Sequence, residues 1–292
     1  MPWRTILLFL LPAIALYAVF LVYPIVQSGR YSLYKWNGFG PLEDFVGFDN
    51  FRDVFGDARF RAALKHNLII VVLSLMLQLP AALGLAMLLN AKIRGRAFMR
   101  TMFFAPYVLS EVVTGVVWRQ ILRPNGLLDQ TMEGVGLGAW TQGWLSDPDV
   151  VLYALFFVIS WKYFGFHMIL LLAGLQQIPD ELKEAASIDG ATGWNTFRYV
   201  TLPLLMPTVR VSVFLSVIGS IQLFDIVWVT TGGGPIGASS TMSTFLYDRF
   251  RDSRFGFASA VSIVIFGCSL VVALLYQRFA LRRDLEGAGP GV

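Results

Sequence analysis

Six apolar stretches alternate with polar stretches along the chain. They cover residues 5–26, 67–89, 102–122, 151–172, 204–229 and 257–279. About 20 consecutive apolar residues are enough to cross the hydrocarbon core of a bilayer as an α-helix. The pattern therefore predicts an all-α integral membrane protein with six transmembrane helices.

The first apolar stretch follows Arg4, as the apolar region of a signal peptide follows its basic end. It is too long for such a region, however, and lacks a clear small-residue cleavage site. We therefore expect a retained transmembrane helix, bent at Pro12 and Pro24.

Residues 29–65 mix charged and aromatic positions. Phe48, Phe51, Val54 and Phe55 recur at helical spacing within this stretch. One or two amphipathic helices lying at the membrane interface are expected here, because the aromatic side chains need cover.

Composition supports the membrane assignment and excludes other classes. Hydrophobic residues make up 56% of the chain and charged residues 14%, whereas soluble domains carry about 25% charged residues. Nucleic-acid binding is not indicated, because the sequence has no basic stripe interleaved with aromatic residues. The single Cys268 gives no disulfide framework, and two histidines, His66 and His167, give no metal cluster.

The orientation follows from the short link at residues 91–100, which contains Lys92, Arg94, Arg96 and Arg100. Short basic loops are retained in the cytoplasm. With six spans, this places both termini and residues 178–207 inside, and residues 29–65, 123–150 and 231–256 outside. Loop 29–65 is also basic, but the rule works best for short links. Arg278, Arg282 and Arg283 mark an inside C-terminal tail.

The polar stretch at residues 178–207 predicts a helix–turn–helix element. Pro179, Asp180 and Glu181 suit the start of a helix, and Gly190 suits a left-handed stop. A second short helical face follows, which Pro203 and Pro207 are expected to close.

Within this stretch lie Glu184-Ala185-Ala186, Asp189-Gly190-Ala191 and Leu202-Pro203. These motifs resemble the EAA loop of ATP-binding-cassette (ABC) importer permeases, with Val200 where Ile is more usual. The flanking residues are similar to the carbohydrate-uptake branch of that family, of the first-permease type exemplified by maltose and glycerol-3-phosphate permeases. The likeness runs over residues 9–281. The chain departs from the maltose permease in having six segments and no large external domain.

The resemblance implies a type I ABC importer transmembrane domain with a cytoplasmic EAA coupling loop. It divides the chain into an N-terminal helix and external loop (1–63), the ABC transmembrane domain (64–281) and a cytoplasmic tail (282–292). The coupling residues it implies are Glu184, Ala185, Ala186, Asp189 and Gly190.

The implied partners are a second permease, giving a heterodimer, an ATPase dimer and an external sugar-binding protein. Sugar and membrane lipid are the other partners, in the cytoplasmic membrane of a prokaryote. No GxxxxGK[ST] or HExxH motif is present. The chain is therefore expected not to be an enzyme and to hold no cofactor, with ATP and Mg²⁺ on the separate ATPase.

Polar and aromatic residues within the apolar stretches are candidates for a sugar path, since sugars pair their hydroxyls and stack their C–H faces. The fifth stretch offers Ser216, Ser220, Gln222, Phe224, Asp225 and Trp228; the third and fourth offer Glu111, Trp161 and His167. Helix packing is the alternative for the serines, and a packed, hydrogen-bonded role for His167. Glu111 is expected to face the cavity or to meet Arg119 or Lys162.

A secondary transporter or channel for a small polar solute is the main alternative function, and a membrane enzyme is the third. The EAA loop and the absence of internal repeats argue against the first alternative. No catalytic constellation supports the second. Disaccharides, oligosaccharides, amino sugars and glycerol-3-phosphate all remain open as substrates.

Overall fold

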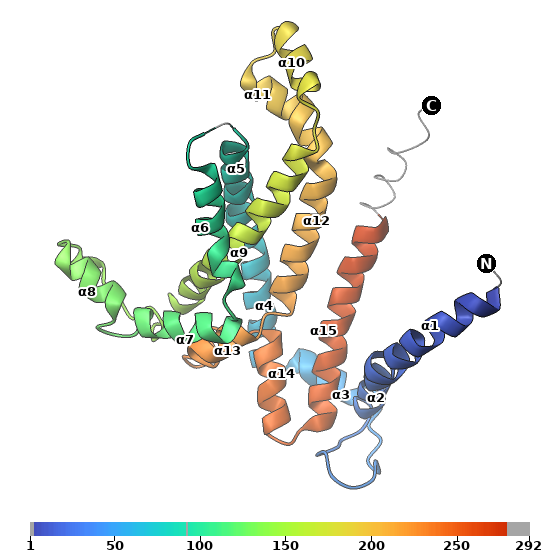
Figure 1. The fold of residues 1–292 in the computed structure, drawn as a ribbon. Coiled ribbons are helices and arrows are strands. Elements are labelled where there is room, and N and C mark those ends of the chain that lie inside the picture. The colour runs from blue at the N-terminus through green and yellow to red at the C-terminus, as the bar shows by residue number, and fades with distance from the viewer. Residues whose placement is uncertain (1–2, 92, 279–292) are drawn as a thin grey trace.

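The computed structural model describes residues 3–91 and 93–278, which form helices joined by loops (Figure 1). Within these residues, five helices are long and apolar enough to cross a membrane. A sixth span results if α6 (Arg96–Val108) and α7 (Glu111–Leu122) are counted together. The six-helix prediction is thus supported, whereas the predicted tail at 282–292 lies outside the described residues.

The spans are built from several helical pieces. The first joins α1 (Trp3–Tyr17), η1 (Ala18–Val22) and α2 (Tyr23–Tyr31), and the second joins α4 (Ala58–Leu73), η2 (Ser74–Gln78) and α5 (Leu79–Asn90). The others are α9 (Val151–Gln176), α12 (Leu202–Ile221) and α15 (Phe255–Tyr276). Shorter helices α8 (Leu127–Gly134) and α14 (Met242–Arg251), with the 3₁₀ turn η3 (Gly138–Trp140), lie between spans.

Three π-helical turns inside the spans each end two residues before a proline. The turns η1, η2 and η4 (Phe197–Thr201) precede Pro24, Pro80 and Pro203. Proline lacks an N–H and its ring crowds the carbonyl four residues earlier, so a wider turn accommodates it. The expectation that Pro203 and Pro207 close a helix was wrong, because α12 contains both.

The third span is bent rather than straight. The prediction of one continuous helix at 102–122 is wrong, because α6 and α7 meet at an angle of 97° around Leu109 and Ser110. The Ser110 hydroxyl accepts from the Val113 N–H at 3.2 Å and caps α7. The buried Lys162 amino group of α9 donates to the carbonyls of Tyr107 and Leu109, which end α6. Both helix ends therefore have partners, which makes the break stable.

The fifth span also ends earlier than predicted. α12 stops at Ile221, and α13 (Asp225–Thr231) follows after a short break, instead of one helix at 204–229. The buried Asn67 side chain donates to the Ser220 and Ile221 carbonyls at 2.6 and 3.4 Å. Its oxygen accepts from the Met242 N–H at 2.8 Å. One amide thus satisfies backbone groups at the end of α12 and the start of α14.

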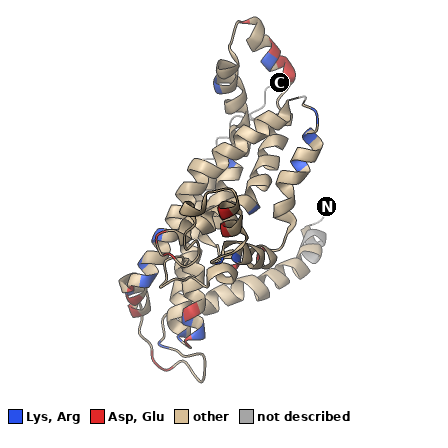
Figure 2. Cartoon of the chain, turned by 90° about the vertical axis from the view of Figure 1, so that its left-hand side faces the viewer, with Lys and Arg blue, Asp and Glu red and all other residues tan. Residues whose placement is uncertain are grey.

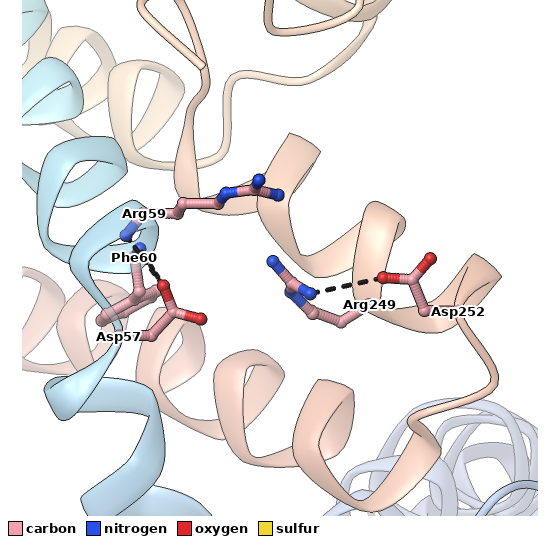
Figure 3. A network of polar contacts seen from close by, with 5 residues as sticks. All are labelled: Asp57, Arg59, Phe60, Arg249 and Asp252. Atoms are coloured by element: carbon pink, nitrogen blue, oxygen red, sulfur yellow. Dashed lines mark hydrogen bonds and ion pairs between the residues drawn. The ribbon is translucent and has the colours of Figure 1, made fainter. Parts of the chain in front are cut away.

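The interfacial helix predicted in the first loop is α3 (Asp49–Gly56). The next helix, α4, begins at Ala58, nine residues before the predicted start at residue 67, because Asp57 caps it. Its carboxylate accepts from the N–H groups of Arg59 and Phe60 at 2.8 and 3.4 Å (Figure 3). Across from it, Arg249 of α14 pairs with Asp252 at 3.3 Å. The cap formed by Asp57 therefore determines where α4 begins.

α9 lies at the centre of the packing. Toward one end, Met168 and Leu171 of α9 pack with Ala82, Ala86 and Leu205 of α5 and α12. The backbones approach closely at Gly165, where an added Cβ would lie 1.9 Å from the Phe103 oxygen of α6. Such small-residue contacts are the usual means of helix packing in membranes.

Many of the charged residues lie toward the two ends of the long helices, and others lie at intermediate heights (Figure 2). The link after α5 lies at the same end as α10 (Asp180–Ile188) and α11 (Gly193–Thr196), whereas α3 and α14 lie toward the other end (Figure 1). This arrangement fits a bundle that crosses a membrane, with the basic link and the predicted EAA loop on one side.

Candidate functional sites

The predicted coupling loop forms a knob, defined here as residues 180–201 (α10, α11 and η4), that projects beyond the long helices (Figure 1). Gly190 ends α10 with φ +79°. Its N–H donates to the Ser187 carbonyl at 3.1 Å, and the Ala191 N–H donates to the Ala186 carbonyl at 2.9 Å. This pair of bonds is a Schellman motif, which explains why glycine suits the position.

The knob exposes apolar as well as polar side chains. Leu182, Ile188 and Trp194 are 44%, 85% and 65% exposed. Of the predicted coupling residues, Glu184, Ala185, Asp189 and Gly190 are exposed and Ala186 is half-buried. An exposed helix with apolar side chains and small alanines offers a surface that a groove on another protein could cover.

A second site is a cavity of about 220 Å³ inside the bundle, lined by α12, α9, α6 and the η2 turn. We call it the central cavity. Its polar lining includes Ser74, Gln78, His167, Ser216 and Ser220. Aromatic faces come from Tyr107, Tyr163 and Phe166, of which Tyr107 and Phe166 stack with centroids 4.8 Å apart. Hydroxyls, an amide and flat apolar faces together suit a sugar.

The structure brings three of the predicted path residues to this cavity, namely Ser216, Ser220 and His167. His167 is also buried and hydrogen-bonded, with Nδ1 2.8 Å from the Ser212 hydroxyl. This agrees with the alternative given from the sequence, in which His167 is a packed residue. The Ser220 hydroxyl donates to the Ser216 carbonyl at 2.8 Å.

Glu111 is half-buried behind the cavity wall and does not line it. Its carboxylate accepts a hydrogen bond from the Tyr163 hydroxyl. Glu111 forms no ion pair with Lys162 or Arg119 in the described part of the chain, and the Lys162 amino group instead donates to the carbonyls of Tyr107 and Leu109. Glu111 and Lys162 thus hold the two sides of the α6–α7 break against α9 and position Tyr107 and Tyr163.

The remaining predicted path residues lie elsewhere. Phe224 and Trp228 stack with centroids 5.9 Å apart, and Tyr247 of α14 contacts both rings. Because α12 ends at Ile221 and α13 starts at Asp225, Ser220 does not share a continuous helix face with Phe224 and Trp228. Gln222 and Asp225 are exposed beside this aromatic group, and Trp161 packs edge-on against Trp118 at 5.4 Å.

Several lining residues were missed from the sequence, above all Gln78, Ser74, Tyr107 and Tyr163. A signal was present for Gln78, a polar residue two positions before Pro80 in an apolar stretch. The tyrosines carried no signal, because tyrosine is equally common where membrane helices meet the interface.

A membrane bundle with an exposed helical knob and a polar internal cavity has the architecture of a permease. The chain belongs to the family described as binding-protein-dependent transport system inner membrane component, whose model matches residues 78–284. This confirms the resemblance proposed from the EAA motif.

Several of the individual relatives are described as sugar permeases. The chain is 37% identical to the lactose transport system permease protein LacF of Rhizobium radiobacter, over 95% of this chain and 93% of that protein. It is 34% identical to the diacetylchitobiose uptake system permease protein NgcF of Streptomyces coelicolor, over 98% and 84%. A crystal structure of a bacterial ABC transporter importing the acidic polysaccharide alginate matches with a TM-score of 0.82 and 26% identity, over 96% of both chains.

Proposed function

We propose that the chain is a membrane-spanning subunit of an ATP-driven importer that carries a sugar across the cytoplasmic membrane of a prokaryote. The observation that carries the proposal is the near full-length likeness to sugar permeases. The central cavity, with its hydroxyl, amide and aromatic lining, supports it.

The energy is proposed to come from a separate ATPase dimer, which binds ATP and Mg²⁺ and docks on the knob. The exposed Leu182 and Ile188 support this, because an apolar surface beyond the membrane helices needs a partner. Glu184, Ala185 and Ala186 would form the contact, and Gly190 would set the turn.

The other proposed partners are a second permease and an external sugar-binding protein. The family description, which names binding-protein dependence, supports the binding protein. The first span supports a second permease, since residues 9–24 are exposed along their whole length on this chain. Lipid and a second permease can share that surface.

The test is uptake of radiolabelled sugars, beginning with lactose and diacetylchitobiose, in cells that express the complete importer. Uptake should stop when the ATPase subunit carries a substitution of its phosphate-binding lysine, and should survive a protonophore while ATP is maintained. Uptake that needs a proton or ion gradient and no ATPase would instead establish the secondary-transporter alternative.

A further inference from the structure

A second pocket, of about 400 Å³, lies between the start of α4, the loop at residues 232–240 and α14. We call it the arginine pocket, and it lies toward the end of the bundle opposite the knob (Figure 1). Arg59 of α4 and Arg249 of α14 line it, and Figure 3 shows the Arg59 side chain reaching toward α14. Two elements far apart in the chain therefore bring two guanidinium groups to one space.

The charge of Arg249 is only partly matched within the chain. Its side chain is 12% exposed and lies over the Phe245 ring, with 4.7 Å between Cζ and the ring centroid. One guanidinium nitrogen lies 3.3 Å from a carboxylate oxygen of Asp252, whose side chain is 57% exposed. The buried Nε has no hydrogen-bond partner among the described residues. Burial of a charged donor is costly unless an acceptor meets it, so this arginine can accommodate a further anionic partner.

The lining of the arginine pocket has a net positive charge, because its charged residues are Arg59, Arg249 and Asp248. Burial raises the pKa of the Asp248 carboxyl, whereas Arg249 and Arg59 act on it in the opposite direction. Over residues 3–91 and 93–278, no ion pair joins Asp248 to either arginine. One further negative charge would neutralise the pocket.

The loop that forms one wall of the pocket is held in place by its own hydrogen bonds. The Ser239 hydroxyl donates to the Gly234 carbonyl at 2.6 Å and lies 2.8 Å from the Thr231 hydroxyl. The Ser240 carbonyl lies 2.9 Å from Nδ1 of His66, which ties the loop to α4. A wall that is already formed loses little conformational entropy when a ligand enters.

Ile236 lies in the same loop and lines the same pocket. It is 100% exposed and has φ +48°. A positive φ is unfavourable for a β-branched residue, and full exposure leaves its apolar surface in water. An apolar side chain beside arginines is typical of a protein–protein interface. A small free anion would leave Ile236 uncovered, so this residue favours a protein as the occupant.

The position of the pocket along α4 separates it from the lipid. Arg59 lies eight residues before the apolar stretch that begins at residue 67, which is about 12 Å of helix. The headgroup region adds only about 5–8 Å on each side of the hydrocarbon core. We therefore expect the arginine pocket in the aqueous phase beyond the headgroups, within reach of a soluble protein.

We propose that the arginine pocket is a socket for an acidic side chain of the external sugar-binding protein, whose carboxylate binds between Arg59 and Arg249. The proposal rests on the proposed function and adds the residues through which this chain holds that partner. Arginine suits the role, because its planar guanidinium donates paired N–H groups to a carboxylate. Ile236 then packs against apolar surface beside that carboxylate.

The test compares Arg59→Gln and Arg249→Gln with Arg52→Gln, an exposed arginine of α3 that does not line the pocket. The complete importer in nanodiscs is titrated with the sugar-loaded binding protein that stimulates its ATPase activity. Both pocket variants should raise the concentration for half-maximal stimulation about tenfold, the loss of one charge-assisted hydrogen bond, and keep the maximal rate. Arg52→Gln should match the wild type. Unchanged titrations for Arg59→Gln and Arg249→Gln, or an equal rise for Arg52→Gln, would overturn the socket.

Arg59→Gln keeps this test valid even if Arg249→Gln lowers the yield of complex. The Arg59 side chain is exposed, and the hydrogen bond printed for this residue in Figure 3 comes from its backbone N–H, which glutamine retains. A fall in the yield of Arg59→Gln would show that the residue supports the fold instead, and would contradict the proposal.

The partner carboxylate is identified by charge reversal. Arg59→Glu is titrated with binding-protein variants that each carry Lys in place of one surface Asp or Glu. One of these variants should recover at least part of the stimulation that Arg59→Glu loses, because the two charges have changed places. Recovery by none of them would overturn the carboxylate contact.

A lipid occupant is tested by the same importer in phosphatidylcholine nanodiscs with and without phosphatidylglycerol. The effect of Arg59→Gln should require the binding protein and should be the same in both lipids. An effect that appears without the binding protein and depends on phosphatidylglycerol would assign the pocket to lipid. Failure of every sugar-loaded binding protein to stimulate the wild-type importer would instead count against the proposed function, so the two failures are distinguishable.

Discussion

At the scale of single residues, buried polar side chains decide where the membrane helices stop. The Lys162 side chain donates hydrogen bonds to carbonyls at the end of α6, and the Asn67 side chain donates to carbonyls at the end of α12. Neither helix end would be tolerated in hydrocarbon without such partners, because a bilayer offers none. These residues position the cavity walls.

The aromatic group of Phe224, Trp228 and Tyr247 also belongs to this scale. Phe224→Ala should reduce sugar uptake while complex yield and membrane insertion stay normal. The prediction assumes that the free face of the ring contacts sugar, and one lost aromatic contact is worth about 0.5–1.5 kcal/mol, or roughly two- to tenfold in uptake. Uptake and yield are measured on the same preparation, with Phe266→Ala at an exposed position of α15 as control. A parallel fall of yield and uptake would show that the ring only packs.

At the scale of elements, close backbone contact holds α9 against α6, and a protruding turn forms the knob. Gly165 allows the first, since its neighbours at Phe103 and Phe104 are backbone atoms that cannot move aside. Gly190 allows the second through its left-handed conformation. The two glycines thus serve different purposes, packing and turning.

Gly165→Ala should separate α6 from α9 and lower the melting temperature of the purified complex. The added Cβ would overlap the Phe103 carbonyl, so the helices must move apart. Gly84→Ala is the matched control, because a Cβ there meets nothing within 4 Å and alanine favours a helix. Equal melting temperatures for the two variants would contradict the close contact.

Glu184→Lys and Gly190→Pro should each abolish uptake while the protein level in the membrane is maintained. The first reverses a charge on the exposed face of α10, and the second removes the N–H that donates to Ser187. Uptake and co-purification of the ATPase are measured together. Gly193→Ala, whose Cβ meets nothing within 4 Å, is the control. Normal uptake in both test variants would rule out coupling through the knob.

At the scale of the whole molecule, the two ends of the bundle face different compartments. The knob and the α5–α6 link share one end, opposite α3 and α14 (Figure 1). The basic link predicts that the shared end is cytoplasmic. The external end would then carry the loops that meet a binding protein.

Cysteine labelling in a Cys268→Ser background tests this orientation. Cysteines replacing Asp53 or Arg251 should react with an impermeant thiol reagent added to intact cells, whereas those replacing Arg96 or Arg198 should react only after permeabilisation. Each variant must retain uptake to be scored. Labelling of position 198 from outside would invert the topology and with it the proposed site for the ATPase.

The spans, the knob and the family could be predicted from the sequence alone. Their signals are local: apolar length sets a span, glycine at 190 sets a turn, and a short motif marks the coupling loop. His167, Ser216 and Ser220 were candidates because polar residues are costly in apolar stretches.

The helix breaks and the cavity were decided only by the tertiary structure. The α6–α7 bend depends on Lys162, and the end of α12 depends on Asn67, which lies 153 residues before Ser220 in the chain. Periodicity within one stretch cannot show a partner supplied by another, so both spans were predicted as single helices. For the same reason the sequence showed Gln78 as a polar residue in an apolar stretch but not as part of the cavity wall, which depends on how the helices pack.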